Sequence, residues 1–224
     1  LGFTRNMSMG EILGQLQAAR AWLGDDLPER PIIRNLVYMG MGEPLLNLPQ
    51  VMRSLQTLHH PRGLNFSARR ITVSTCGIEH GLRELGESGL AYLAVSLHAP
   101  TQELRARLMP KAARWPLDEL VTALESYPLK TRERITLEYL VIGGVNDGPE
   151  QARQLVRLCS RLKAKLNLIP YNPTPGSAYR PPTPESLLAF EKMLWDKHVT
   201  AIVRKSKGQD IEAACGQLRA ALRD

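Results

Sequence analysis

Residues 36–49 read LVYMGMGEPLLNLP and contain a complete transition from strand to helix. The first four residues, Leu36 to Met39, form a short apolar run of the kind that is typical of a buried strand. Gly40, Gly42 and Glu43 follow, and Pro49 then stands where the first turn of a helix accepts proline. An apolar strand that leads directly into a helix predicts a βα unit of a parallel sheet.

The same alternation continues in both directions along the 224 residues. Six strands, each followed by a helix, leave two α/β architectures open, a doubly wound open sheet and a whole or partial (βα) barrel. Ser8 begins a capping box that predicts a further helix in front of the first strand. The expected strands are 36–39, 71–74, 92–97, 134–142, 166–170 and 199–203, and the expected helices are 8–23, 49–58, 78–85, 101–109, 117–126, 150–162, 184–195 and 210–222.

The composition excludes several other classes of protein. Hydrophobic residues make up 43% and charged residues 23% of the chain, which is ordinary for a globular protein and excludes a disordered chain or a coiled coil. No apolar run of about 18 residues is present, so no membrane-spanning helix is expected. The three cysteines, Cys76, Cys159 and Cys215, are far apart and match neither a disulfide framework nor a zinc site, which favours a reducing compartment. The net charge of +7 permits a nucleic-acid partner without requiring one.

Both architectures place functional groups at the carboxyl ends of the strands. Glu43 is the most informative of these, because a carboxylate at a sheet edge needs either an internal Arg or Lys or a ligand that donates, such as an ammonium group or ribose hydroxyls. Ser74 and Ser96 are each compatible with an ordinary turn or cap, and His98 with a structural hydrogen bond. Asn172 lies between two prolines and has two donors and an acceptor. Together these residues predict a polar small-molecule site, a pattern that thiamine, flavin or nicotinamide barrels would match equally well.

The C-terminal part of the chain contains Cys215 within AACGQL, residues 213–218. Small neighbours would leave the thiol accessible, and the basic segment 204–207 favours a thiolate. From the residues alone, Cys215 is either a buried helical cysteine or a nucleophile. Cys159 is expected to be a core residue of an amphipathic helix, and the role of Cys76 stays open.

Four motifs occur in one order along the chain: MGMGEPLLN at 39–47, SLHAP at 96–100, IPYNP at 169–173 and DIEAACGQL at 210–218. Together they closely resemble the radical S-adenosylmethionine RNA adenine methyltransferases, and the resemblance covers essentially the whole chain. It is closer to the branch that methylates carbon 2 of adenine in 23S ribosomal RNA and in some tRNAs than to the branch that methylates carbon 8.

This resemblance implies a partial (βα)6 barrel similar to a TIM barrel. In the family, a small domain and a C-x-x-x-C-x-x-C loop that binds a [4Fe–4S] cluster come first, and this sequence contains neither. We therefore expect residues 1–224 to be a barrel domain that is incomplete at its N-terminus, lacks the first strand and the cluster loop, and carries the catalytic cysteine in segment 204–224. The chain alone is expected to be inactive, and none of its residues is expected to bind a metal.

The resemblance also implies two cofactors, S-adenosylmethionine and the [4Fe–4S] cluster, whose ligands would lie upstream of this chain. One S-adenosylmethionine would methylate a cysteine, and a second would yield the 5′-deoxyadenosyl radical that activates the methyl group for adenine. Carried over residue by residue, the resemblance implies that Gly42 and Glu43 bind the α-ammonium group. Ser74 and the turn Ser96-Leu97-His98 would bind the carboxylate and ribose. Asn172 would contact the nucleoside end, and Cys215 would accept the methyl group.

The partners implied in the same way are 23S rRNA and tRNA, together with an electron donor for the cluster. Because the target adenine has to be unstacked, the RNA should present a flipped or looped base. A cytoplasmic monomer without membrane contact is expected. Two alternatives remain: a radical S-adenosylmethionine enzyme that acts on a substrate other than RNA, and an RNA-binding remnant without catalytic activity.

Overall fold

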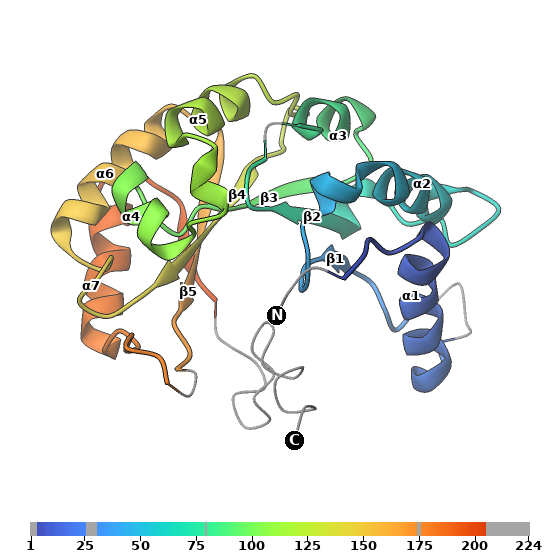
Figure 1. Cartoon of the computed structure of the whole chain (residues 1–224), viewed down its shortest axis with the longest axis horizontal. Coiled ribbons are helices and arrows are strands. Elements are labelled where there is room, and N and C mark those ends of the chain that lie inside the picture. Colours follow the sequence, from blue (N-terminus) through green and yellow to red (C-terminus); the bar gives the residue numbers. More distant parts are fainter. Residues whose placement is uncertain (1–3, 26–30, 79, 174–175, 205–224) are drawn as a thin grey trace. The chain divides into compact units, whose positions relative to one another are not determined.

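A computed structural model describes residues 4–25, 31–78, 80–173 and 176–204 (Figure 1). Strands and helices alternate along the chain, as the apolar pattern predicts. The strands are β1 (Leu36–Tyr38), β2 (Ile71–Thr75), β3 (Tyr92–Ser96), β4 (Ile135–Val141), β5 (Ala164–Pro170) and β6 (Ala201–Val203). The α-helices are α1 (Met9–Leu23), α2 (Leu48–His59), α3 (Leu82–Ser88), α4 (Gln102–Leu108), α5 (Leu117–Glu125), α6 (Pro149–Ser160) and α7 (Pro184–Trp195), and the 3₁₀ helices are η1 (Pro44–Asn47), η2 (Ala68–Arg70) and η3 (Ala112–Arg114).

The six strands form one sheet in the order β1-β2-β3-β4-β5-β6. The pairs β1 with β2, β4 with β5 and β5 with β6 are parallel, and Glu138 of β4 lies opposite Asn167 of β5. A doubly wound sheet would reverse its order at a switch point. Strands that follow one another in sequence order, with helices between them, have the order of a (βα) barrel. The predicted α/β fold of the partial-barrel type is confirmed.

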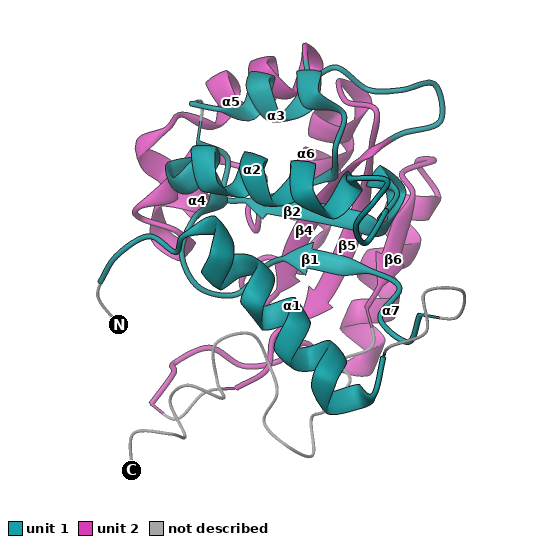
Figure 2. Ribbon diagram, turned by 90° about the vertical axis from the view of Figure 1, so that its right-hand side faces the viewer, with its two compact units in different colours: residues 1–94, 127–133 teal, residues 95–126, 134–224 magenta. Residues whose placement is uncertain are grey.

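The chain divides into two compact units, residues 1–94 with 127–133 and residues 95–126 with 134–224 (Figure 2). The division falls within β3. Glu43 and Ser74 therefore belong to the first unit, whereas Ser96 and Asn172 belong to the second. The prediction of one domain over the whole chain remains a prediction.

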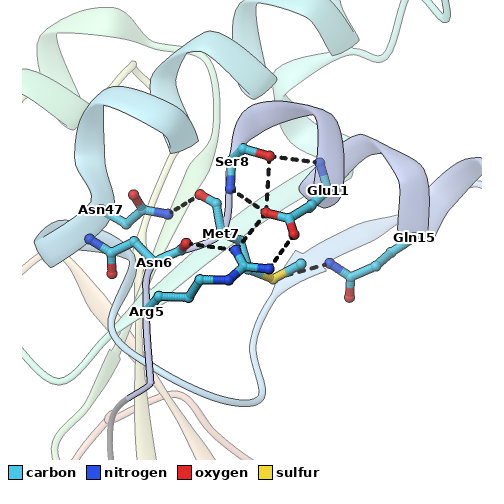
Figure 3. A network of polar contacts seen from close by, with 7 residues as sticks. All are labelled: Arg5, Asn6, Met7, Ser8, Glu11, Gln15 and Asn47. Carbon is cyan, nitrogen blue, oxygen red and sulfur yellow. Dashed lines mark hydrogen bonds and ion pairs between the residues drawn. The ribbon is translucent and has the colours of Figure 1, made fainter.

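The first unit begins with a network of polar contacts around the start of α1 (Figure 3). The Ser8 hydroxyl accepts a hydrogen bond from the Glu11 N–H at 3.3 Å, and the Glu11 carboxylate accepts one from the Ser8 N–H at 2.8 Å, so the predicted capping box is present. Arg5 forms an ion pair with the same carboxylate. The Asn47 side chain donates to the Met7 carbonyl at 2.9 Å, which attaches the segment before α1 to η1.

One helix of the first unit starts later than the sequence predicts. The pattern indicated a helix over 78–85, but α3 runs from Leu82 to Ser88. Gly77 and Gly81 have φ angles of 85° and 87°, and this left-handed backbone keeps the chain out of the helical conformation until Leu82. Gly89, with φ 60°, ends the helix.

The core of the second unit is built on the alternation within β4. Leu137 and Tyr139 are fully buried on one face of the strand, and the Tyr139 ring stacks on Phe190 of α7 with centroids 5.8 Å apart. Helix α7 begins where predicted, because the Thr183 hydroxyl accepts a hydrogen bond from the Ser186 N–H. The helix expected at 210–222 lies outside the described residues. Within the described part of the chain, no helix combines the length and the apolar character that crossing a membrane requires.

Candidate functional site

Glu43 lies in the loop between β1 and α2, at the N-cap of η1. One of its carboxylate oxygens, Oε1, accepts a hydrogen bond from the Leu45 N–H at 3.0 Å, and Oε2 accepts one from the Cys76 N–H at 2.8 Å. A carboxylate has about four acceptor sites, so about two remain for a ligand. None of the ion pairs among the described residues includes Glu43, so the internal Arg or Lys partner that the sequence left open is not found.

Two glycines give the loop its path to Glu43. Gly40 and Gly42 have φ angles of 134° and 86°, in the region that side chains disfavour. A Cβ atom at either position would meet no heavy atom within 4 Å, so the requirement for glycine is one of backbone conformation rather than of space. Leu45, which is only 1% exposed, anchors η1 in the apolar core.

The end of β2 forms the other side of the Glu43 contact. Ser74 is half-buried, on the opposite strand face from the buried Val73. The Thr75 hydroxyl accepts a hydrogen bond from the Gly77 N–H at 3.0 Å, which closes the turn. Cys76 reaches Glu43 through its backbone N–H. This contact uses a backbone donor, which carries no sequence signal, and the role of the Cys76 thiol stays open.

In the second unit, the turn Ser96-Leu97-His98 is attached to β4. The Leu97 and His98 N–H groups both donate to the Glu138 carbonyl, at 3.0 and 3.1 Å. The Ser96 hydroxyl donates to the Glu138 carboxylate at 3.4 Å. All three predicted residues of this turn therefore bond to Glu138, an acid that the sequence analysis did not identify.

His98 is held as a neutral donor. Its Nδ1 atom accepts a hydrogen bond from the Leu140 N–H at 3.1 Å, so the ring proton is on Nε2. Burial, together with the Arg105 cation, lowers the pKa of His98 to about 4. At neutral pH the side chain can therefore donate a hydrogen bond to a ligand, but it is a poor base.

Asn146 is a second residue that the sequence analysis missed. It is fully buried, and its Oδ1 accepts a hydrogen bond from the Ile142 N–H at 2.7 Å. Its Nδ2 donates to the carbonyls of Leu140 at 2.6 Å and His98 at 3.1 Å. The signal in the sequence was an asparagine two residues after Gly144 at the end of a strand, since asparagine in such a loop often bonds to nearby backbone.

Asn172 is half-buried in the loop that follows β5. The preceding residue, Tyr171, donates its N–H to the Val141 carbonyl at 2.9 Å. Farther along the loop, the Arg180 carbonyl accepts a hydrogen bond from the Gly143 N–H at 3.0 Å. A Cβ atom at position 143 would lie 2.5 Å from the Pro181 carbonyl oxygen, so the path of this loop depends on Gly143.

Among the described residues, neither a cluster of metal ligands nor a surface depression adds to the candidate site. No group of three or more His, Cys, Asp or Glu side chains among the described residues could hold a metal ion, so these residues do not fit an iron–sulfur cluster. Two surface depressions, of about 480 and 300 Å³, contain none of the predicted site residues. Cys215 lies outside the described residues.

Comparison with known proteins gives the superfamily to which the chain belongs. The radical SAM superfamily profile matches residues 5–157. The "Dual-specificity RNA methyltransferase RlmN" of Nitratidesulfovibrio vulgaris is 73% identical over 220 residues, which are 98% of this chain and 60% of that protein. The protein of the same name from Oleidesulfovibrio alaskensis is 70% identical over 224 residues, 99% of this chain and 62% of its own length. The chain thus spans about 60% of the length of these curated relatives.

A solved structure gives the same result for the fold. The crystal structure of a radical SAM methyltransferase from Sphaerobacter thermophilus superimposes with a TM-score of 0.88 at 44% identity, over 96% of this chain and 63% of that one. Superfamily membership implies S-adenosylmethionine and a [4Fe–4S] cluster as cofactors. The profile match covers more than half of the residues, and the strand order is that of a partial barrel. The chain belongs to the radical SAM superfamily.

Proposed function

We propose that the protein methylates carbon 2 of adenine in RNA, with 23S rRNA and tRNA as substrates and S-adenosylmethionine as the methyl source. The observation that carries this proposal is the set of hydrogen bonds that the Glu43 carboxylate makes. Its carboxylate is held by two backbone N–H groups, lacks an ion-pair partner among the described residues, and has about two acceptor sites left. Relatives named as RNA methyltransferases at 70–73% identity support the choice of substrate.

The described residues suit different parts of S-adenosylmethionine. Glu43 would bind the α-ammonium group through charge-assisted hydrogen bonds, with Gly42 setting the backbone that presents it. The Nε2–H of His98 is a donor and suits an acceptor such as the carboxylate. Ser74 is a second candidate for the carboxylate, and Asn172 would contact the nucleoside end. These roles follow the resemblance and are compatible with the hydrogen bonds that the residues already make.

A [4Fe–4S] cluster, held by residues other than the described ones, would supply the electron for cleavage of S-adenosylmethionine. Cys215 is proposed as the thiol that accepts a methyl group and carries it to the base. Such a carrier is chemically reasonable, because adenine carbon 2 is an electron-poor centre that does not attack a methylsulfonium directly.

The net charge of +7 is compatible with a phosphate-bearing substrate. The adenine has to leave its stack before carbon 2 can be reached, so a loop or bulge of the RNA is the expected target. An electron donor for the cluster, a monomeric state and a cytoplasmic location are part of the same proposal.

The decisive experiment uses a full-length, cluster-bearing enzyme that contains these residues. It would be incubated with S-adenosylmethionine, a reductant and unmodified 23S rRNA or tRNA, and the nucleosides would be analysed by mass spectrometry against synthetic standards. We expect 2-methyladenosine from the wild type and none from Glu43→Ala. Formation of 8-methyladenosine, or cleavage of S-adenosylmethionine without RNA modification, would contradict the proposal.

A further inference from the structure

Glu138 is a buried acid in the middle of β4 to which the proposed function gives no role. The residue is only 6% exposed. Leu137 and Tyr139, its neighbours along the strand, are fully buried among the apolar residues of the opposite face. Glu138 therefore lies on the other face of the strand, where it is paired in register with Asn167 of β5. A carboxylate so deeply buried costs free energy unless hydrogen bonds compensate for the loss of water.

Every residue of the turn Ser96-Leu97-His98 bonds to Glu138. The main-chain carbonyl of Glu138 accepts the N–H groups of Leu97 at 3.0 Å and His98 at 3.1 Å. Its side-chain Oε2 accepts the Ser96 hydroxyl at 3.4 Å. The backbone contacts set the path of the turn and would survive a change of side chain, whereas the contact to Ser96 depends on the carboxylate.

The contact to Ser96 determines what that serine can offer a ligand. A serine hydroxyl has one proton to donate and two lone pairs that accept. In the hydrogen bond between the two side chains, Ser96 is the donor and gives its proton to Oε2 of Glu138. The Ser96 oxygen is then left as an acceptor toward any other partner, and the half-buried position of the residue leaves it open to one.

We propose that Glu138 is a positioning residue that fixes the Ser96 oxygen as the acceptor for a ribose hydroxyl of S-adenosylmethionine. The inference rests on the proposed function. The methionine carboxylate has only acceptors and cannot pair with an oxygen whose proton is already given away. A ribose hydroxyl can donate. Of the two ligand groups that the resemblance assigns to the whole turn, Ser96 therefore takes the ribose.

The test measures binding of S-adenosylmethionine by anaerobic calorimetry in a full-length, cluster-bearing enzyme. Glu138→Met keeps the approximate length and volume of the side chain but removes the hydrogen-bond acceptor. We expect about a tenfold loss of affinity for S-adenosylmethionine. Glu138→Gln keeps an oxygen that can accept the Ser96 proton, so most of the affinity should return. In a Ser96→Ala background, Glu138→Met should cause no further loss, because the residue acts through Ser96.

A matched control separates this role from a general effect of losing a buried acid. Glu133 is 7% exposed and accepts a hydrogen bond from the Lys130 N–H in the first unit, so Glu133→Met should leave the affinity unchanged. An equal loss in Glu138→Gln and Glu138→Met would show that the charge itself acts on the ligand and would overturn the proposal. A further loss from Glu138→Met in the Ser96→Ala background would overturn it as well.

A second measurement applies if Glu138→Met does not fold. The wild type should bind S-adenosylhomocysteine about tenfold more tightly than its 2′-deoxy or its 3′-deoxy analogue, and Ser96→Ala should abolish that difference. Equal affinity of the wild type for all three compounds would overturn the proposal. A wild type that bound no S-adenosylmethionine at all would contradict the proposed function instead, so the two failures are distinguishable.

Discussion

The Cys76 N–H donates a 2.8 Å hydrogen bond to Oε2 of Glu43 and so joins the end of β2 to the loop that follows β1. With the Leu45 N–H at 3.0 Å on Oε1, it fixes both oxygens of the carboxylate before any ligand is bound. Such preorganisation lowers the entropy that a ligand loses on binding. It also means that Glu43 contributes to the structure of the loop as well as to the proposed binding of an ammonium group.

Glu43→Gln tests both contributions. The amide removes the charge and places an NH₂ group against one of the two backbone donors, so we expect a loss of about 1.5–3 kcal/mol in the affinity for S-adenosylmethionine, or roughly ten- to a hundredfold. Calorimetry on a cluster-bearing enzyme measures it. Glu11→Gln is the control, because Glu11 belongs to the same unit and its carboxylate is paired with Arg5. Unchanged affinity in Glu43→Gln would leave Glu43 with a structural role alone.

Gly143→Ala should displace the loop that carries Asn172. The new Cβ would lie 2.5 Å from the Pro181 carbonyl oxygen, a backbone atom that cannot move alone, so we expect a destabilisation of about 1–3 kcal/mol in urea unfolding. Proteolysis within 171–182 should become faster. Gly14→Ala is the matched control: no atom lies within 4 Å of its Cβ position in α1, and alanine there should stabilise by about 0.5–1 kcal/mol. Equal stability of Gly143→Ala and the wild type would show that the loop has room to adapt.

Glu11 predicts a loss of stability in acid. The Arg5 side chain, and then the backbone and hydroxyl of Ser8, lower the pKa of Glu11 from 4.5 to about 2 (Figure 3). A carboxyl group whose pKa is lower in the folded state stabilises the protein above the pKa of the unfolded state, and this contribution is lost as the pH falls from about 4.5 to about 2. The midpoint of thermal unfolding should fall as the pH is lowered across this range. The fall should be smaller in Glu11→Gln and in high salt. The same pH dependence in both proteins would exclude a contribution from Glu11.

His98 predicts a pH dependence at higher pH. Its pKa is lowered from 6.5 to about 4, so below pH 6.5 the unfolded chain binds the proton more readily than the folded one. Above pH 6.5, His98 therefore does not lower the free energy of unfolding. As the pH falls from 6.5 toward 4, the free energy of unfolding declines by up to about 3 kcal/mol. His98→Asn should remove this decline, since asparagine tolerates the φ of +55° and its side-chain oxygen can accept the Leu140 N–H. Nitrogen chemical shifts that place the proton on Nδ1 at neutral pH would contradict the assignment.

Cys215 carries the proposed chemistry. In a complete enzyme, Cys215→Ala should fold, bind S-adenosylmethionine and transfer no methyl group to RNA, because the carbon that joins adenine first has to reside on that sulfur. Tryptic peptides of active enzyme should carry an added methyl group on Cys215 and on neither Cys76 nor Cys159. Cys159→Ala is the control, because burial raises the pKa of its thiol to about 12 and makes it unreactive. Methylation of RNA by Cys215→Ala would exclude a covalent carrier.

Much of the fold was predictable, because it is encoded in local signals. Helix α7 begins at Pro184 after the Thr183 cap, and α1 follows the Ser8 capping box, both as predicted. The late start of α3 was not predictable in the same way. The apolar pattern at 78–85 is helical, whereas the positive φ angles of Gly77 and Gly81 are choices that glycine permits without requiring them.

The candidate site shows the same division. The sequence by itself made Glu43, Ser96 and His98 candidates, because polar residues at the ends of apolar strands are visible in a linear pattern. Only the tertiary structure showed that the Cys76 N–H holds Glu43, and that Glu138 and Asn146 hold the turn. These contacts join residues 33–48 positions apart, and two of them use backbone groups that every residue type shares. Local sequence determines which groups stand at a strand end, whereas the pairing of distant segments decides which hydrogen bonds those groups make.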